Sequence, residues 1–378
     1  MDKYLIVGSG LTGAVFAQTL AAAGRKVLVL EQRNHIGGNC FDMLDASEIM
    51  IHRYGAHIFH TEFEDVWNYL SRFTRWRRYE HEVLAFVEND FIPIPFNFNT
   101  LQKVFNENAS SIKQKFLEKY ELKTKISVLE LLKQKDPVLK NIGIYVYEKL
   151  FKNYTYKQWG LKADEIAPEV IARVPIYTDH DNRYFTDTYQ GIPEDGYTSM
   201  IETMLSNPNI DIQLDTPFEK VCKFVDGEIS LNGSLFNGIL VYTGQTDVLF
   251  QYKFGRLPYR SLRFEFEPLK KTFYQPKAVV NYPNDHDYTR IIETKHMTGQ
   301  ECPTTTICRE YPQQYRPLQN DPYYPLFTDE SKQQYEQYAN TAHKYNNLIL
   351  AGRLAEYRYY DMDDAVKNAR IKARKLLA

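Results

Sequence analysis

The sequence predicts an α/β protein with a discontinuous Rossmann-type domain, an inserted helical domain and an antiparallel β-sheet domain. The first indication is the N-terminus, where apolar strands at 4–7 and 27–30 flank a glycine-rich turn and a helical run. The second is another buried strand at 347–351, which meets a glycine. Between these ends lie a helical pattern over 100–156 and strand-like alternation over 250–330. The nucleotide-binding elements therefore come from both ends of the chain.

The turn after the first strand reads Gly8-Ser9-Gly10-Leu11-Thr12-Gly13, and Glu31 ends the second strand. Gly8 allows the tight turn, Gly10 lets a pyrophosphate approach the helix N-terminus, and Gly13 lets helix and strand pack closely. Glu31 can accept the ribose hydroxyls of an adenosine. A glycine-rich turn without a ligand is the alternative, but the agreement of strands, glycines, helix and carboxylate favours a dinucleotide.

Glu31 and the residues that follow it distinguish between FAD, NAD and NADP as the cofactor. An acidic strand end suits a free 2′-hydroxyl, as in FAD or NAD, better than the 2′-phosphate of NADP. The next turn, from Arg33 to Asn39, is basic and contains a second glycine pair. It resembles the extended FAD fingerprint of flavoproteins of the glutathione-reductase and amine-oxidase type, so FAD is the favoured cofactor.

Composition excludes several classes of function. The chain has 378 residues, enough for two or three domains, and a net charge of −2, which gives no general attraction to nucleic acid or anionic membrane. We see no secretory signal and no stretch long enough for a membrane span, so we expect a cytoplasmic protein. The four cysteines lack CxxC spacing, and we expect no metal site. The 29 Tyr and 22 Phe exceed what a core needs and suggest a cleft for rings or sugars.

Local patterns place the domain limits. Ser127 and Glu130 have the spacing of a capping box, Gly196 opens an amphipathic helix, Asn232-Gly233 signals a hairpin, and acidic residues at 361–364 begin a last helix with a basic end. We expect the cofactor domain at 1–65, 194–248 and 339–378, the helical domain at 99–168, and the sheet domain at 66–98, 169–193 and 249–338.

His57 and His60 lie in a strand-like stretch, three residues apart. As a pair they could be metal ligands, but a third ligand at suitable spacing is missing from the stretch. From the residues alone, polar side chains satisfied within a strand and loop are the preferred interpretation.

Several stretches together resemble the bacterial UDP-galactopyranose mutase family. They occur in family order over almost the whole chain: 8–13, 35–39, 54–61, 154–155, 157–160, 173–175, 189–193, 288–293, 310–312, 322–325, 352–357 and 360–362.

The resemblance implies an active site in the cleft between the FAD, helical and sheet domains. It implies interconversion of UDP-galactopyranose and UDP-galactofuranose, which supplies galactofuranose for cell-surface polysaccharide. In the family, N5 of reduced flavin attacks the anomeric carbon and displaces UDP, so FAD is active when reduced. The partner is a nucleotide sugar, and a homodimer is one assembly to expect.

The resemblance also assigns residues. Trp159, Tyr154 and Tyr184 match the uridine region, Arg173 and Arg290 the diphosphate clamp, and His57 and His60 positions beside the flavin. The expected catalytic residues are Arg173, Arg290 and His60. The expected cofactor-binding residues are Gly8, Ser9, Gly10, Thr12, Gly13, Glu31, Gln32, Arg33, Gly38, Asn39, His57, Gly352, Arg353, Asp361 and Met362.

The substrate-binding residues expected from the resemblance surround the sugar nucleotide: Tyr323 and Tyr359 match tyrosines near the phosphates and sugar, and Glu310 a carboxylate on the sugar side. The full set is His81, Phe151, Tyr154, Thr155, Trp159, Arg173, Tyr184, Arg290, Glu310, Tyr323, Arg353 and Tyr359. We also expect residues 161–175, with Arg173, to close over bound substrate.

Two departures from the family pattern leave the preferred sugar open. Leu150-Phe151 stands where a pair of aromatic residues is expected, and His81 where an asparagine is expected. The alternatives are a mutase of UDP-N-acetylgalactosamine or TDP-fucose, a flavin oxidoreductase of the amine-oxidase type, and a nucleotide-sugar binding protein without catalysis.

Overall fold

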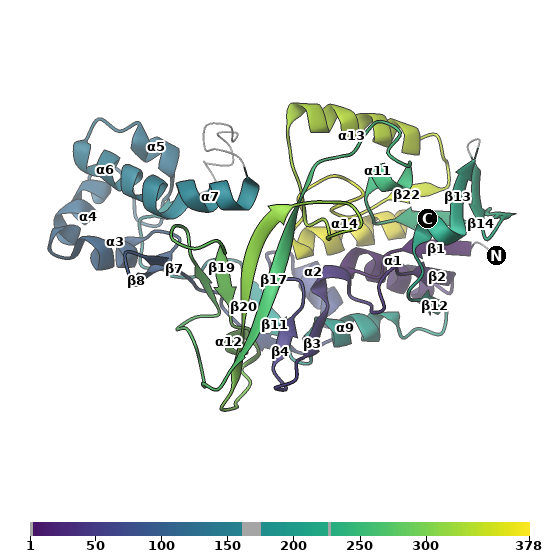
Figure 1. The fold of residues 1–378 in the computed structure, drawn as a ribbon, viewed down its shortest axis with the longest axis horizontal. Coiled ribbons are helices and arrows are strands. Elements are labelled where there is room, and N and C mark those ends of the chain that lie inside the picture. Colours follow the sequence, from purple (N-terminus) through teal and green to yellow (C-terminus); the bar gives the residue numbers. More distant parts are fainter. Residues whose placement is uncertain (1–2, 161–174, 226–227) are drawn as a thin grey trace.

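The computed structural model describes residues 3–160, 175–225 and 228–378. In this part of the chain, Figure 1 shows a group of helices at one end, a sheet with long strands in the middle, and a helix-covered sheet at the other end, where both termini lie. The predicted α/β fold with an inserted helical domain and a second sheet is confirmed.

The N-terminal strand lies inside a parallel sheet. Its strand order is β12-β2-β1-β16-β22, and all neighbouring pairs are parallel. The side chains of β1 alternate between two cores, because Ile6 and Leu5 belong to different buried clusters. Burial on both faces explains the near-continuous apolar run in the sequence. The strands are β1 (Lys3–Val7), β2 (Lys26–Leu30), β12 (Ile210–Gln213), β16 (Ile239–Tyr242) and β22 (Leu348–Leu350).

Helices cover both faces of this sheet. Helix α1 (Leu11–Ala22) packs with α9 (Gly196–Leu205) and α14 (Met362–Lys375) on the face of Ile6. Helix α13 (Asp329–Ala342) lies on the face of Leu5 with α10 (Phe218–Val221), α11 (Thr246–Leu249) and a small antiparallel meander. The strands of the meander are β13 (Cys222–Val225), β14 (Glu228–Leu231) and β15 (Ser234–Leu235).

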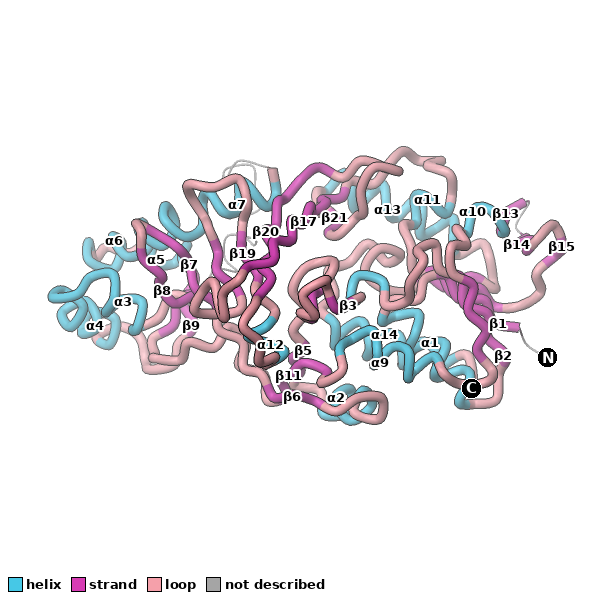
Figure 2. The backbone as a smooth tube through the Cα atoms, turned by 60° about the horizontal axis from the view of Figure 1, so that its bottom comes forward, coloured by secondary structure: helices cyan, strands magenta, loops and turns pink. Residues whose placement is uncertain are grey.

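The middle sheet has the order β21-β17-β20-β19-β18-β7-β8. The described pairs are antiparallel except β18 and β7, which run parallel. The predicted antiparallel sheet therefore contains a parallel pair, whose strands lie far apart in the sequence and are joined by the long connection that parallel neighbours need. Figure 2 shows the long strands β17 and β20 side by side between the helical and parallel-sheet bodies. The strands are β7 (Val83–Val87), β8 (Asp90–Ile94), β17 (Tyr259–Leu269), β18 (Val279–Asn281), β19 (Arg290–Ile292), β20 (Thr305–Gln314) and β21 (Tyr324–Pro325).

The helical body has its own core, which includes Leu101 and Phe116. Ser127 caps a helix as predicted, but its Oγ accepts from the backbone N–H of Leu129, and the Glu130 carboxylate accepts instead from the Tyr120 hydroxyl. The elements are α3 (Phe98–Phe105), η2 (Asn106–Asn108), α4 (Ala109–Leu117), β9 (Lys125–Ser127), α5 (Val128–Leu132), α6 (Pro137–Tyr145), the π-helix η3 (Val146–Phe151), α7 (Lys152–Trp159) and β10 (Pro175–Tyr177).

Two helices cross the expected domain limits. Helix α2 (Glu64–Leu70) buries Leu70 in the same core as α1, and α13 buries Tyr338 beside the parallel sheet. By packing, we assign both helices to the parallel-sheet body, although the sequence placed most of their residues in the sheet domain. The remaining elements are η1 (Gly38–Cys40), β3 (Asp42–Leu44), β4 (Met50–His52), β5 (Phe59–Thr61), β6 (Trp76–Arg78), β11 (Tyr189–Pro193) and α12 (Lys295–Thr298).

Two local predictions hold in atomic detail. Asn232 and Gly233 both have positive φ between the paired strands β14 and β15, as a tight hairpin requires. Helix α14 has Asp363 and Asp364 in its first turn and basic residues in its last, which matches the helix dipole.

Candidate active site

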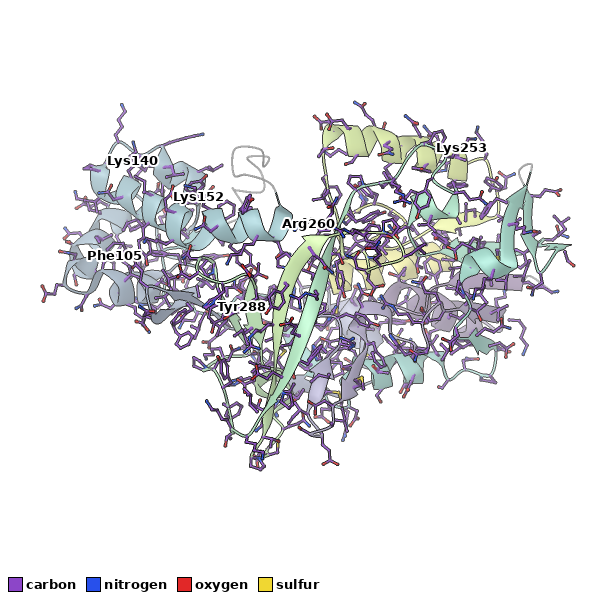
Figure 3. All side chains as sticks on the ribbon, in the orientation of Figure 1. Phe105, Lys140, Lys152, Lys253, Arg260 and Tyr288 are labelled. Carbon is purple, nitrogen blue, oxygen red and sulfur yellow. The ribbon has the colours of Figure 1, made fainter. Side chains whose placement is uncertain are left out.

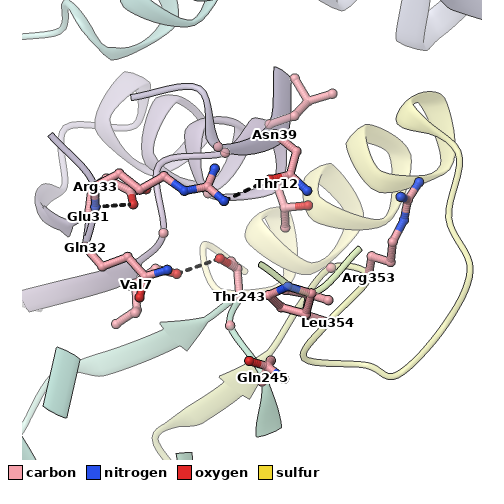
Figure 4. A pocket seen from close by; sticks show the side chains of 18 of the residues that line it. Val7, Thr12, Glu31, Gln32, Arg33, Asn39, Thr243, Gln245, Arg353 and Leu354 are labelled. Atoms are coloured by element: carbon pink, nitrogen blue, oxygen red, sulfur yellow. Dashed lines mark hydrogen bonds between the residues drawn. The ribbon is translucent and has the colours of Figure 1, made fainter. Parts of the chain in front are cut away.

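A cavity of about 300 Å³ opens where strands β1, β2 and β16 end. This is the edge at which parallel sheets bind nucleotides. Figure 4 shows Glu31, Gln32 and Arg33 on one wall and Arg353 and Leu354 on the opposite wall. The expected cofactor residues that line the cavity are Gly8, Gly10, Thr12, Gly13, Glu31, Gln32, Arg33, Gly38, Asn39, His57, Gly352, Arg353, Asp361 and Met362.

The glycine turn is shaped by close backbone contacts. A Cβ on Gly13 would lie 1.9 Å from the Gly8 carbonyl oxygen, so helix α1 can pack against the turn only with glycine there. A Cβ on Gly38 would lie 2.8 Å from the Gly10 Cα. The two glycine-rich turns therefore meet backbone to backbone at Gly10 and Gly38, and at that point no side chain would block a phosphate.

Glu31 is buried in the cavity wall, and its carboxylate accepts three hydrogen bonds. Its Oε2 accepts from the backbone N–H and the hydroxyl of Ser9, each at 2.8 Å, and its Oε1 accepts from the backbone N–H of Arg33 at 2.9 Å. A carboxylate has about four acceptor positions, so these contacts leave capacity for a ribose hydroxyl. Ser9 thus supports the site through Glu31.

The opposite wall comes from the C-terminal part of the chain. Gly352 has φ +89 and lies against Thr12 of the first turn. The Arg353 guanidinium donates to the Tyr360 carbonyl, which holds it at the start of α14. Because Asp361 and Met362 begin that helix, its N-terminal end faces the cavity.

His57 lines this wall and contacts the buried His52. Burial lowers the pKa of His52 to about 4, and burial followed by repulsion from His52 lowers the pKa of His57 to about 3. His57 Nδ1 lies 2.8 Å from the Gly55 carbonyl, and its backbone N–H donates to His52 Nδ1. The described residues contain no group of His, Cys, Asp and Glu suited to a metal ion.

A second group of side chains, the arginine-tyrosine cluster, lies between the sheet and helix α7. It consists of Arg290, Glu310, Tyr154, Tyr184, Tyr324, Tyr359 and Arg353. Arg290 Nε donates to Glu310 Oε1 at 2.7 Å, and the Glu310 side chain is almost fully buried. Burial, then the Glu310 charge, raises the pKa of Tyr324 to about 12. Arg353 stands 5.1 Å from the Tyr359 ring centre and also lines the cavity, so it joins the two groups.

The fold and the sequence both match known proteins. Residues 149–359 match the family described as UDP-galactopyranose mutase, and residues 6–73 match the NAD(P)-binding Rossmann-like domain. The chain is 36% identical to UDP-galactopyranose mutase of Mycoplasma genitalium, over 99% of this chain and 94% of that protein. The chain therefore belongs to the UDP-galactopyranose mutase family. This membership indicates an FAD cofactor and an isomerase.

The chain also resembles a mutase of a different sugar nucleotide and two proteins of known structure. The chain is 33% identical to a dTDP-fucopyranose mutase of Escherichia coli, over 98% of this chain and 97% of that protein. Its fold is similar to that of a reduced UDP-galactopyranose mutase crystal structure, with TM-score 0.71 and 14% identity over 100% and 96% of the two chains. A putrescine oxidase shares the fold more distantly, with TM-score 0.56 and 11% identity over 100% and 99%.

In this mutase-family structure, the neighbouring tyrosines Tyr323 and Tyr324 face different groups. Tyr323, the expected substrate residue, lines the cofactor cavity and is buried near Arg33 and Asp321. Tyr324, which sequence reasoning missed, stacks with Tyr359 at 6.4 Å and lies near Arg290. The two neighbours therefore contact different groups, and the assignment of Tyr323 to the substrate stays a prediction.

The other expected substrate residues lie in the helical body, beside Phe185, or outside the described residues. Phe151 ends the π-helix and is buried in the helical core, with Leu150 packed against it, while Thr155 is buried in α7. Three expected features lie outside the described part of the structure. They are the Trp159 side chain, Arg173, and residues 161–174 of the expected lid. His60 lies on β5 and His81 just after β6, and both flank Phe185.

Sequence reasoning also missed part of the cavity wall. Thr243, Gly244 and Gln245 follow strand β16 and line the cavity, and Thr243 Oγ1 donates to the Val7 carbonyl at 2.7 Å. The signal was present, because a buried strand that ends in Thr-Gly returns the chain to the same sheet edge as the first glycine turn.

Helix α7, which carries Tyr154, is fixed at its end by Arg260 of β17. Arg260 Nε donates to the Gln158 carbonyl at 3.0 Å, and its Nη2 donates to the Lys157 carbonyl at 3.2 Å. Figure 3 shows Arg260 where the helical body meets the sheet. The guanidinium satisfies carbonyls at the helix C-terminus and so holds α7 in register with the cluster.

Proposed function

We propose that this protein is an FAD-dependent mutase that interconverts UDP-galactopyranose and UDP-galactofuranose. The observation that carries the proposal, beyond family membership, is the position of Arg353. This side chain lines the cofactor cavity and lies over two tyrosines of the arginine-tyrosine cluster. A sugar bound in the cluster would therefore lie beside the ring end of a cofactor in the cavity.

The cavity residues fit FAD. The glycine turns at Gly10 and Gly38 would leave room for the pyrophosphate, Glu31 would accept a ribose hydroxyl, and the start of α14 would approach the flavin ring. When bound and reduced, FAD supplies a nucleophile for the anomeric carbon of the sugar. His57, neutral and held by the Gly55 carbonyl, would pack beside the ring without adding a charge.

The cluster residues fit a nucleotide diphosphate. Arg290 would bind the diphosphate, while Glu310 holds the guanidinium in place through its 2.7 Å contact. We propose Tyr324 and Tyr359 as hydroxyl partners of the phosphates and sugar, and Tyr154 and Tyr184 as ring partners towards the uridine. The roles of Arg173 and Trp159 rest on the resemblance alone.

A direct assay tests the function. Dithionite-reduced protein should convert UDP-galactopyranose to UDP-galactofuranose, and the oxidised protein under air should not. Chromatography of the sugar nucleotides with and without reductant checks this. Full activity of the oxidised protein would contradict the mechanism, and oxygen consumption during turnover would favour an oxidase.

A second candidate is a mutase of a related sugar nucleotide. His81 occupies a position where an asparagine is expected, and burial lowers its pKa to about 3, so a neutral ring would face the substrate. A ring in place of an amide removes hydrogen-bonding groups for a sugar hydroxyl, which suits a deoxy sugar. Parallel assays of UDP-galactose, UDP-N-acetylgalactosamine and TDP-fucose decide between them.

Finer aspects of the cellular role are also proposals. Among the described residues, no helix has both the length and the apolar character to cross a bilayer. We propose a cytoplasmic homodimer whose product supplies galactofuranose for cell-surface polysaccharide. Light scattering of the purified protein would test the dimer.

A further inference from the structure

His60 is held from two sides by the short segment 185–188. Its Nδ1 lies 3.1 Å from Oδ2 of Asp187. Its ring stacks on Phe185, with the ring centres 3.6 Å apart and the planes at 14°. Neither Phe185 nor Asp187 was singled out from the sequence, and the two together restrain both the orientation and the plane of the imidazole.

The segment itself is anchored to the strands that carry His60. The Gln190 side-chain amide donates to the carbonyls of Phe185 at 3.0 Å and Asp187 at 2.9 Å. Glu62 accepts from the backbone N–H and hydroxyl of Thr188 at 2.9 and 2.8 Å. Gln190 pairs with His60 across strands β11 and β5, so Asp187 is held in place before any ligand binds.

This unit adjoins the arginine-tyrosine cluster. The Phe185 ring also faces His81 at 5.9 Å, and Tyr184 lies 5.1 Å from Phe185. After burial, the charges of Arg290 and His60 lower the pKa of His81. The titratable or charged groups around His60 are thus Asp187, His81 and, beyond His81, Arg290, while Asp363 of α14 binds the hydroxyl of neighbouring Thr61.

We propose that His60, positioned by Asp187 and Phe185, carries the proton that the ring contraction must move; this rests on the proposed function. When the pyranose opens, the C1–O5 bond breaks and O5 gains a proton. When the furanose closes, the C1–O4 bond forms and the 4-hydroxyl loses a proton. The gain and the loss balance, so no oxidant or further reactant is needed. With Nδ1 on the carboxylate, Nε2 is the nitrogen that exchanges the proton.

Asp187→Asn tests the positioning role, with Glu194→Gln as a matched control. Each variant removes one carboxylate, but Glu194, just after strand β11, pairs with the exposed Arg75 and contacts neither His60 nor the 185–188 segment. We expect D187N to lower kcat by about 100-fold, with KM changed less than about twofold. Because Asp187 supplies the negative charge at Nδ1, its removal should also change the kcat–pH profile, which a merely structural role would not do. E194Q should keep kcat within about twofold and leave the profile unchanged.

The outcomes separate this proposal from the proposed function. FAD absorbance and UDP binding must match the wild type in both variants, and Asp187→Glu should recover part of the lost kcat. Equal losses in D187N and E194Q with unchanged pH profiles would overturn the proton-carrier role, as would a change in KM alone. Wild-type protein that forms no furanose from any of the three sugar nucleotides would overturn the proposed function and this proposal with it.

Discussion

The cofactor cavity and the arginine-tyrosine cluster are built in different ways. The cavity wall is mostly backbone from short strand-to-helix turns, where the absence of side chains at Gly10 and Gly38 creates the space. The cluster is mostly side chains, brought from helix α7 and from strands β19, β20 and β21. The difference implies that single changes should affect each region almost independently, and the predictions below test that separation.

The largest effect is expected from Gly13→Val. Its Cβ would lie 1.9 Å from the Gly8 carbonyl oxygen, so the turn and helix α1 cannot keep their contact. We expect protein that purifies without yellow colour and binds no added FAD. Gly24→Asn is the control, because Gly24 has φ +78 in open space and asparagine tolerates that conformation. A G13V protein with full FAD content would contradict the backbone description of the cavity.

Arg290→Ala should act on the other region. Removing the guanidinium takes away a diphosphate contact and leaves the buried Glu310 carboxylate unpaired. We expect kcat/KM to fall by at least about tenfold with FAD retained. Arg309→Ala is matched, since Arg309 of β20 pairs with the half-exposed Glu267 away from the cluster. Loss of flavin from R290A would show that the regions are not separate. Arg173→Ala offers the same test for a residue outside the described ranges.

Arg260→Gln should give a smaller, purely positional effect. Without its donors to the Lys157 and Gln158 carbonyls, α7 loses its register with the sheet. We expect KM to rise by about three- to fivefold with kcat and FAD content nearly unchanged, because only the Tyr154 side of the cluster moves. Arg263→Gln on the same strand, whose guanidinium pairs with Glu265, should behave like the wild type. A fall in kcat for R260Q would place Arg260 in the chemistry.

The smallest expected effect is a change in the free energy of unfolding with pH. It compares one histidine from each region, His57 and His81. Burial lowers the pKa of His57 and of His81 to about 3, against about 6.5 in an unfolded chain. The unfolded state therefore takes up protons first as pH falls, and stability is lost below the unfolded pKa. Each histidine should reduce the free energy of unfolding by about 0.7 kcal/mol between pH 7 and pH 6.

Melting temperatures of the holoprotein at several pH values check this. His57→Gln and His81→Gln should each flatten the decline towards acid, whereas the exposed His343→Gln should not. Parallel declines in all three variants would show that other groups control acid stability.

The difference between the two regions also explains where sequence reasoning succeeded. The glycine turns, Glu31 and the Gly352 wall were predicted as a set and line or support the same cavity, because each depends on local strand-turn-helix geometry. Tyr323 was predicted at the substrate and lines the cofactor cavity, whereas Tyr324 lies in the cluster; a sequence motif cannot tell which group each of two adjacent side chains meets. Phe151 was expected at the substrate; it ends the π-helix at 146–151 and is buried in the helical core, and such packing is a tertiary property that no local motif records.

The glycine-rich dinucleotide turn, the strands on either side of it and the family could be predicted from the amino-acid sequence, because apolar periodicity and glycine spacing are local properties of the chain. Three contacts are visible only in the folded structure: Asp187 with His60, Arg260 with the last carbonyls of α7, and α13 with the parallel sheet. These contacts join residues far apart in the sequence, and their geometry depends on how the sheets and helices pack, which no local pattern records.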